Sequence, residues 1–274
     1  MRPVQHVLWI GGPPAAGKST VATRLARRHG LRLYRADTRT WAHRDRALAA
    51  GNAAARRWEA TTPADRWERA TAEEMFEMSL HRERGPMVID DLRALPVSPM
   101  IVAEGTPLPA SAVSSGVALH SHAVWLLPTP DVQHARLAAA GTTAGAAALY
   151  RRLADEIERE ARDHGVPTVI VDGSAGIADT VSVVERLLAD ALSAGPVART
   201  PAERRSLLRE MNEAIVEQVR GYYARPWATG DPESVEQLFV CECGEPTCDV
   251  DVQRTVGGVA TAPALAPGHA GYRA

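Results

Sequence analysis

Lysine is almost absent from this chain of 274 residues: of the 31 basic residues only Lys18 is a lysine, and the other 30 are arginine. When arginine replaces lysine wherever a positive charge is sufficient, a remaining lysine marks a position that needs a compact ammonium group rather than a planar guanidinium. Lys18 lies in a segment rich in glycine and proline, directly after an apolar run. It is therefore the first candidate functional residue of the sequence.

Net charge and long apolar runs are also lacking. The formal net charge is −2, so no basic surface of the kind that binds nucleic acid or an acidic membrane is indicated. No apolar run approaches the roughly 18 residues of a membrane span. Residues 1–3 lead into a short predicted strand without the apolar core of a signal peptide. We therefore expect a cytoplasmic protein with no membrane or nucleic-acid partner.

Cysteine is scarce as well, and its three copies are clustered within residues 241–248 with the spacing Cys-x-Cys-x4-Cys. In a reducing cytosol, clustered thiols are better explained by a metal than by disulfides. A closed tetrahedral zinc site needs four ligands, and His269 is the nearest downstream candidate for the fourth. We expect a structural zinc site at Cys241, Cys243, Cys248 and His269. Three partly buried thiols without a metal are the alternative.

Short apolar runs alternate with helical patterns along the first two thirds of the chain. Strands are predicted at residues 7–10, 31–34, 101–104, 123–127 and 168–171. The runs show no period of two, and helical segments separate them, so a three-layer α/β fold is predicted, with about five parallel strands and helices on both faces. The helices include one opened by Pro63 that runs to about residue 84, one from Pro130 to residue 141 and one over residues 150–164.

Residues 86–91 resemble an apolar strand that ends in carboxylates. A strand at 101–104 follows only a few residues later, whereas two neighbouring parallel strands need a connection of about a dozen residues. We therefore predict a helix over residues 86–95 and a strand at 101–104. Ala194-Gly195-Pro196 then marks a boundary between a nucleotide-binding domain, 1–193, and a C-terminal part, 197–274, that consists of a helix opened by a capping box at Thr200 and the cysteine-rich tail.

The segment around Lys18 has the pattern Gly-x4-Gly-Lys-Ser, between a predicted strand and a predicted helix. In this context backbone N–H groups and the helix N-terminus attract phosphate oxygens. We expect Lys18 to contact the β and γ phosphates of ATP, Ser19 to bind Mg²⁺ and Thr20 to support the α phosphate. The whole predicted phosphate-binding run is Gly12-Pro13-Pro14-Ala15-Ala16-Gly17-Lys18-Ser19-Thr20.

Acidic residues follow two of the predicted strands. Ligands of open parallel sheets bind at the carboxyl ends of the strands, and Asp37 and Glu104 occupy such ends. Asp37 suits the catalytic base of a transfer to a hydroxyl group, and Glu104 suits a contact to Mg²⁺ through water or to the substrate. The alternatives are a helix cap at Asp37 and a salt bridge at a strand end for Glu104.

Three arginines are candidates for closing the active site, because guanidinium groups bind transferring phosphoryl groups. Arg136, Arg151 and Arg152 flank residues 141–148, a segment of small residues that suits a flexible lid. Arg136 is the one we assign a catalytic role, and a solvent-exposed surface position is the alternative for each. Residues 172–174, Asp-Gly-Ser, are a candidate support for adenine or an ordinary turn. Trp41, Trp58 and Trp67 are candidates for a stacking surface or for core packing.

In their order along the chain, these segments resemble the small-molecule and nucleotide kinases of the P-loop superfamily, such as the adenylate, gluconate and shikimate kinases. The resemblance is carried by the phosphate loop, Asp37, the run Val-Ala-Glu-Gly at 102–105, Leu-Leu-Pro-Thr-Pro before an arginine-containing helix, and Val-Asp-Gly-Ser at 171–174, and it covers roughly residues 1–193. The whole chain is also similar to uncharacterised actinobacterial ATP-binding proteins with a cysteine-containing C-terminal tail.

The resemblance implies ATP, Mg²⁺ and transfer of a phosphoryl group to a small-molecule hydroxyl or phosphate acceptor, and it names no acceptor. The leading prediction is therefore an ATP-dependent phosphotransferase. The alternative is an ATP-hydrolysing switch that acts on a partner through its C-terminal part.

Overall fold

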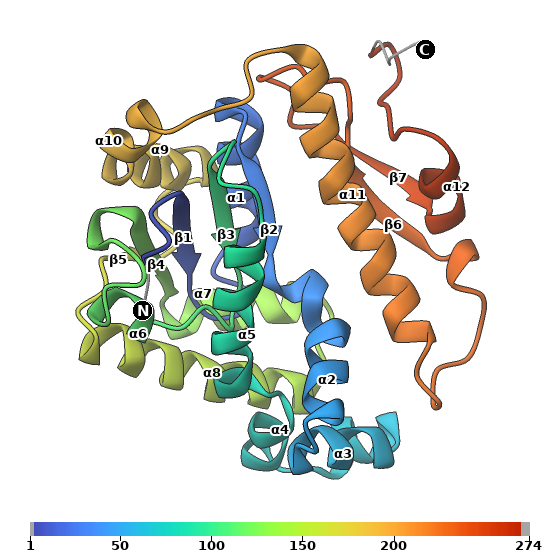
Figure 1. The fold of residues 1–274 in the computed structure, drawn as a ribbon. Coiled ribbons are helices and arrows are strands. Elements are labelled where there is room, and N and C mark those ends of the chain that lie inside the picture. Colours follow the sequence, from blue (N-terminus) through green and yellow to red (C-terminus); the bar gives the residue numbers. More distant parts are fainter. Residues whose placement is uncertain (1–2, 270–274) are drawn as a thin grey trace.

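Five short strands pair in parallel in the computed structural model, which describes residues 3–269 (Figure 1). Their order across the sheet is β2-β3-β1-β4-β5. The strands are β1 (Val7–Gly11), β2 (Arg32–Arg35), β3 (Ile101–Glu104), β4 (Ala123–Pro128) and β5 (Thr168–Val171). Each bound lies within one residue of its predicted place, and the α/β class with a five-stranded parallel sheet is confirmed.

Burial on both faces explains why β1, β3 and β4 appear as continuous apolar runs, whereas the edge strands β2 and β5 are partly exposed. All five residues of β1 are buried. Trp9 packs with Trp125 in the core on one face of the sheet, whereas Leu8 and Ile10 belong to the core on the other face. A strand with no solvent-facing side has no need of alternating polar residues.

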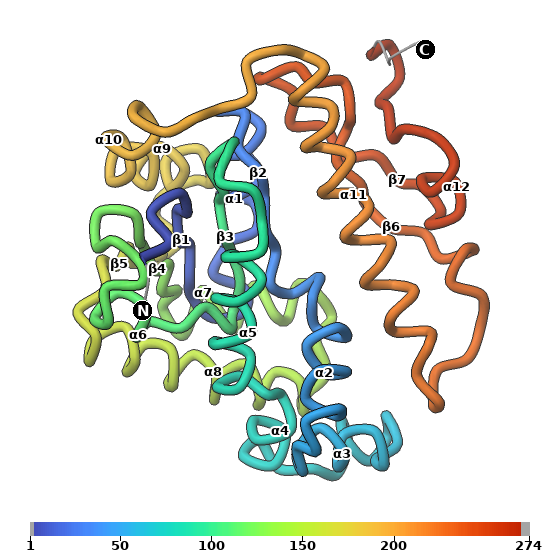
Figure 2. Tube along the Cα trace, in the orientation of Figure 1, coloured from blue at the N-terminus to red at the C-terminus, as the bar shows by residue number. Residues whose placement is uncertain are grey.

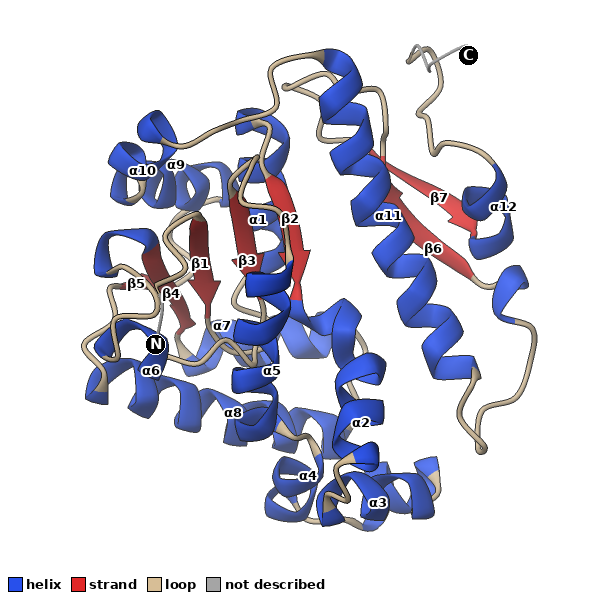
Figure 3. Cartoon of the chain, viewed as in Figure 1, coloured by secondary structure: helices blue, strands red, loops and turns tan. Residues whose placement is uncertain are grey.

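Helices cover both faces of this sheet and complete three layers (Figure 3). On the face of Trp9 lie α5 (His81–Ala94) and α8 (Ala144–Asp163), and on the opposite face lie α1 (Lys18–His29) and α9 (Ile177–Leu187). The shorter elements between them are α6 (Ser111–Ser114), η3 (His120–His122), α7 (Pro130–Ala139) and α10 (Ala189–Ala194). The position of α5 confirms a helix over residues 86–94 in place of a strand.

A lobe of short helices lies beyond the ends toward which the arrows of β1, β2 and β3 point (Figure 3). It contains η1 (Ala36–Arg39), α2 (Thr40–Ala49), α3 (Ala53–Ala60), the π-helical turn η2 (Asp65–Arg69) and α4 (Ala72–Met78). The prediction of one helix from Pro63 to about residue 84 is wrong. Thr71 and Glu74 form a capping box that starts α4, and Leu80 at φ 59° separates α4 from α5.

Helix α8 begins earlier than predicted. The side chain of Thr143 accepts a hydrogen bond from the N–H of Ala146, so residues 144–148 are the first turns of the helix. A Cβ on Gly145 would lie 2.0 Å from the backbone oxygen of Trp67, so this glycine permits close packing. The flexible lid predicted over residues 141–148 is therefore wrong for all but Gly141, Thr142 and Thr143.

The chain beyond Gly195 forms α11 (Pro201–Tyr223), η4 (Pro232–Ser234), β6 (Glu236–Val240), β7 (Asp251–Thr255) and α12 (Val256–Thr261). The capping box at Thr200 starts α11 as predicted. Strands β6 and β7 pair as an antiparallel hairpin that the sequence analysis did not predict. Helix α11 contacts β2 on one side and β6 on the other (Figure 2), and Phe239 is fully buried in a small core beside α11.

The described residues include most of the two predicted units, 1–193 and 197–274; residues 1–2 and 270–274 lie outside them. Within 3–269, no helix combines the length and the apolar character needed to cross a membrane.

Candidate functional site

The loop between β1 and α1 has a backbone that favours glycine. Gly12 and Gly17 have φ angles of 133° and 90°. A Cβ on Gly12 would lie 2.2 Å from the backbone oxygen of Leu126, so the absent side chain allows the loop to lie against β4. Gly17 turns the chain into α1, whose first residue is Lys18. The predicted phosphate-binding run therefore stands between a strand and a helix N-terminus, as its pattern requires.

Lys18 is held beside this loop. Its side chain is 5% exposed, and Nζ donates a hydrogen bond to the backbone oxygen of Pro13 at 2.8 Å. Burial lowers the pKa of Lys18, and the carboxylates of Asp37 and Glu104 oppose that shift. A cation beside a helix N-terminus and its loop amides provides a setting complementary to an anion.

Glu104, at the end of β3, contacts the first turn of α1. Its carboxylate is 1% exposed and accepts a hydrogen bond from Ser19 Oγ at 3.1 Å, and Arg35 Nε lies 3.7 Å away. Burial and the charge of Asp37 raise the pKa of Glu104, whereas Lys18 and Arg35 lower it. The predicted strand-end salt bridge is thus present. The same carboxylate also lies beside the hydroxyl group that the sequence assigns to Mg²⁺.

Asp37 lies in η1, directly after β2, and its side chain is exposed. No side chain caps η1, so the helix-cap interpretation of Asp37 finds no support. The charge of Asp37 acts on Lys18, Glu104 and Arg84, which shows that the aspartate lies among the charged groups at this end of the sheet. Asp37 also borders the cavity next to the loop.

A cavity of about 720 Å³ extends from the loop into the helical lobe. At its loop end it is bordered by Gly17, Lys18, Ser19 and Thr20. Arg136 also borders it, and Nη1 of this arginine donates a hydrogen bond to the backbone oxygen of Ala15 at 2.9 Å. Deeper in the cavity the wall includes side chains from α2, α3, α5, α8 and α11: Arg44, Trp58, Arg84, Leu149, Tyr150, Leu153 and Gln218.

Other residues singled out in the sequence lie outside this cavity. Arg152 forms ion pairs with Glu73 and Glu156, and Arg151 is exposed and does not border the cavity. In residues 172–174, the carboxylate of Asp172 accepts hydrogen bonds from the backbone N–H and the hydroxyl of Ser174, as expected of an ordinary turn. For these residues the structural alternatives account for the contacts.

Of the three tryptophans, Trp58 borders the cavity, whereas Trp41 and Trp67 pack against other aromatic rings. Trp58 borders the cavity and carries the guanidinium of Arg44 4.3 Å from its ring centroid. Trp41 packs against Tyr222 and Trp227, and Trp67 packs edge-on against Trp58. Sequence reasoning missed Arg44, Arg84 and Gln218 altogether. Nothing in their spacing distinguishes them, because separate helices bring them to one cavity.

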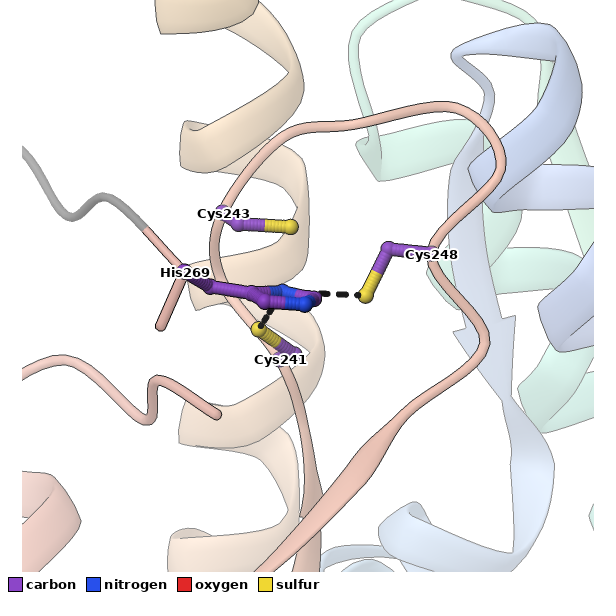
Figure 4. Close-up of side chains that lie close together, drawn as sticks. All are labelled: Cys241, Cys243, Cys248 and His269. Carbon is purple, nitrogen blue, oxygen red and sulfur yellow. Dashed lines mark hydrogen bonds between the residues drawn. The ribbon is translucent and has the colours of Figure 1, made fainter. Parts of the chain in front are cut away.

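The three cysteines and His269 come together in the C-terminal unit (Figure 4). His269 Nδ1 lies 3.4 Å from the sulfur of Cys241 and 3.6 Å from that of Cys248. One ligand atom from each of the four residues lies within 4.8 Å of every other. Cys241 and Cys243 are buried, and no disulfide joins the three cysteines. The four residues that the sequence predicted to form a metal site are therefore neighbours.

This cysteine–histidine cluster lies close to α1 and α11. Arg27 in α1 donates hydrogen bonds to the backbone oxygens of Cys248 and Val250, and Arg205 in α11 donates one to the backbone oxygen of Cys243. Arg27 also pairs with Asp251 at 2.9 Å. The loop that carries the cysteines is thus attached to the helix that begins at the phosphate loop.

No protein-family model matches the chain, and the search of curated proteins found no match either. The proposals for this protein rest on its own residues and their arrangement.

Proposed function

We propose that the protein is a phosphotransferase of the P-loop kinase type that transfers the γ-phosphoryl group of ATP to a small-molecule acceptor. The observation that carries this proposal is the single cavity that joins the loop at Lys18 and Ser19 to Asp37 and continues well beyond them. A phosphate-binding loop alone needs no such extension. A cavity that continues past a candidate base has room for a second substrate, which favours a transferase over a nucleotide switch.

In this proposal the loop residues Gly12 to Thr20 bind the phosphates through backbone N–H groups and the Lys18 ammonium. The Ser19 hydroxyl and the Glu104 carboxylate, 3.1 Å apart, are oxygen donors of the kind that Mg²⁺ prefers, directly or through water. Mg²⁺ bound there would neutralise phosphate charge during transfer.

The chemical step itself forms a bond between an acceptor oxygen and the γ-phosphorus and breaks the bond between that phosphorus and the bridging oxygen of ADP. Asp37 accepts the proton that the acceptor hydroxyl loses. Arg136, which is held at the loop through the backbone oxygen of Ala15, contributes positive charge near the transferring group. The proposed location is the cytoplasm, where ATP is available.

Because Lys18 is the chain's only lysine, one labelling experiment tests the phosphate site directly. An acyl-phosphate derivative of ATP acylates the neutral amine of a lysine that lies beside the bound phosphates, with release of ATP. Peptide mass spectrometry should find one labelled side chain, Lys18, and excess Mg-ATP should prevent the labelling. Lys18→Arg is the matched control, since it keeps the positive charge and removes the reactive amine. Labelling that ATP does not reduce would contradict the nucleotide site, and acceptor-dependent consumption of ATP then separates a transferase from a switch.

We also propose that Cys241, Cys243, Cys248 and His269 bind a structural Zn²⁺. Zinc bonds of about 2.3 Å to sulfur and about 2.0 Å to nitrogen, at the tetrahedral angle, place sulfur and nitrogen about 3.5 Å apart. The two sulfur–nitrogen distances to His269, 3.4 and 3.6 Å, fit that separation. Four protein ligands leave no open position for a substrate, so the site suits a structural role.

A further inference from the structure

Three buried arginines, on α2, η2 and α5, have no acidic partner in the described part of the chain. Arg44, Arg66 and Arg84 are 2%, 1% and 7% exposed, and none has a carboxylate within 4.0 Å among residues 3–269. Other buried arginines of this chain do have one: Arg27 pairs with Asp251 and Arg225 with Asp45. Burial of a charge without a compensating partner is costly, so the three guanidinium groups call for an explanation.

The burial of Arg66 has a structural explanation. Its guanidinium lies between two indole rings, 4.4 Å from the centroid of Trp58 and 4.3 Å from that of Trp227, and it donates a hydrogen bond to the backbone oxygen of Trp58. Such stacking accounts for a buried arginine without any ligand. Arg66 also does not border the cavity.

Arg44 and Arg84 differ from Arg66 because both border the cavity; an unpaired Nε is found on Arg66 as well. Arg44 donates one hydrogen bond, from Nη2 to the backbone oxygen of Met78, while its Nε and Nη1 have no partner. Arg84 donates from Nε to His43 and from Nη2 to the backbone oxygen of Ala36, and no partner for its Nη1 is found in the described chain. The two unpaired donors of Arg44 are buried, and a buried donor left unpaired costs about 1–3 kcal/mol, and more when it is charged.

The pKa shifts of Arg44 and Arg84 agree with a site for an anion. Burial lowers the pKa of Arg44 to about 9, and the positive charges of Arg84 and Arg66 add to that effect, whereas Glu59 opposes it. Burial also lowers the pKa of Arg84, against the charge of Asp37. Arginine keeps its proton at neutral pH, so both guanidinium groups carry a positive charge that a bound anion would offset.

The neighbouring wall of the cavity is mainly apolar. Trp58, Leu149 and Leu153 present apolar surface to the same cavity, and Gln218 from α11 borders it with an Oε1 that has no hydrogen-bond partner. A small ligand that fits these surfaces combines an anionic group with an apolar or aromatic part. A polar N–H or O–H on such a ligand would satisfy Gln218.

We propose that Arg44 and Arg84 form an anion-binding subsite for the phosphoryl acceptor, so that the acceptor is an organic molecule with a phosphate or carboxylate group and an apolar part. The role of this subsite as an acceptor site rests on the proposed transferase function, whereas anion binding itself can be measured without ATP. Phosphate and carboxylate offer the same chemistry to a guanidinium fork, and the choice of probe distinguishes them.

Calorimetric titration with phenyl phosphate, benzoate and phenol tests the subsite. The titrations use the Lys18→Ala protein, so that anion binding at the phosphate loop is weakened and no turnover is needed. We expect one of the two anions to bind at least about tenfold more tightly than phenol, as a charged hydrogen bond predicts. The tighter of the two identifies the anionic group. Equal affinities for all three probes, or no binding of either anion, would overturn the proposal.

Variants locate the bound anion. In the same background, Arg84→Gln and Arg44→Gln should each weaken binding of the preferred anion by about tenfold or more, whereas Arg162→Gln, on the surface of α8, should leave it unchanged. Circular dichroism checks folding, and Arg84→Lys, which keeps the charge, should retain part of the affinity if Arg84→Gln does not fold. Binding that is indifferent to both glutamine variants places the anion elsewhere and refutes the subsite. Anion binding through Arg84 without any ATP binding in the wild-type protein would instead refute only the transferase.

Discussion

Gly12 offers the most direct test of the loop geometry, because the effect of one added methyl group can be worked out. At φ 133° an alanine would occupy a region that residues with a side chain rarely adopt, which costs about 1–3 kcal/mol. Its Cβ would also lie 2.2 Å from the backbone oxygen of Leu126. Because that atom belongs to β4, it cannot swing away as a side chain would, and overpacking of this kind costs about 1–3 kcal/mol. Gly12→Ala should therefore lower the free energy of unfolding by about 2–6 kcal/mol.

Gly165→Ala is the matched control. Gly165 also has a positive φ, 61°, but a Cβ there would meet no atom within 4 Å. The left-handed conformation costs alanine about 1–2 kcal/mol, and the loss of chain freedom in the unfolded state offsets about 0.4–1 kcal/mol of that. We expect a loss of about 1 kcal/mol.

Urea denaturation followed by circular dichroism gives both free energies. The loop must also move if Gly12→Ala folds, so the labelling of Lys18 by the ATP derivative should fall in this variant and remain in Gly165→Ala. If the two variants are equally stable within about 0.5 kcal/mol and label equally well, the contact of the loop with β4 has been misjudged. The argument that only glycine permits this phosphate loop would then fail.

Two further predictions concern parts of the molecule away from the loop. Burial would raise the pKa of Glu156, but hydrogen bonds from Arg82, Arg152 and Arg159 outweigh it and hold the pKa at about 2. Glu156→Gln should therefore destabilise the protein at pH 7, and the difference in stability from wild type should shrink as the pH falls from about 4.5 toward 2. A difference that does not depend on pH would contradict the ion-pair role. Metal analysis should find about one equivalent of zinc in the wild type and in His120→Ala, an exposed histidine outside the cluster, and less than half an equivalent in Cys243→Ser. Full zinc content in Cys243→Ser would exclude the four-ligand site.

The parts of the fold that sequence could predict are those governed by local signals. The central strands β1, β3 and β4 are short apolar runs because both of their faces are buried, and the bounds of β3 and β5 were predicted to the residue. The start of α11 at Thr200 follows from a capping box that acts within four residues. The phosphate loop, likewise, depends on glycines and a lysine that are adjacent in sequence.

Errors arose where one local signal concealed another. Pro63 and Thr62 are a sound start for a helix, but the capping box of Thr71 and Glu74 lies inside the predicted helix and starts a separate helix, α4. Gly145 suggested flexibility, whereas its role is to let α8 approach the backbone of Trp67. In both cases a specific contact, and not residue composition, determines where the helix begins.

The inner end of the cavity could not have been predicted at all. Arg44 and Arg84 are two of thirty arginines and lie forty residues apart, on α2 and α5. Only the packing of the helical lobe against the sheet brings both to the cavity that Trp58 borders. The distinguishing property of these side chains is the absence of a carboxylate within 4.0 Å among residues 3–269, and that property exists only in three dimensions.

The C-terminal unit reaches the candidate functional site by two routes, which suggests why the five-stranded sheet carries such an appendage. Helix α11 brings Gln218 to the wall of the cavity, and Arg27, on the helix that starts at Lys18, binds the backbone of the cysteine loop. The small core around Phe239 depends on α11, so a cluster that fixes the cysteine loop also fixes α11. If the cluster binds zinc as proposed, removal of the metal with a chelator should disturb the wall at Gln218, and calorimetric titration of the chelated protein should then show weaker binding of the preferred anion.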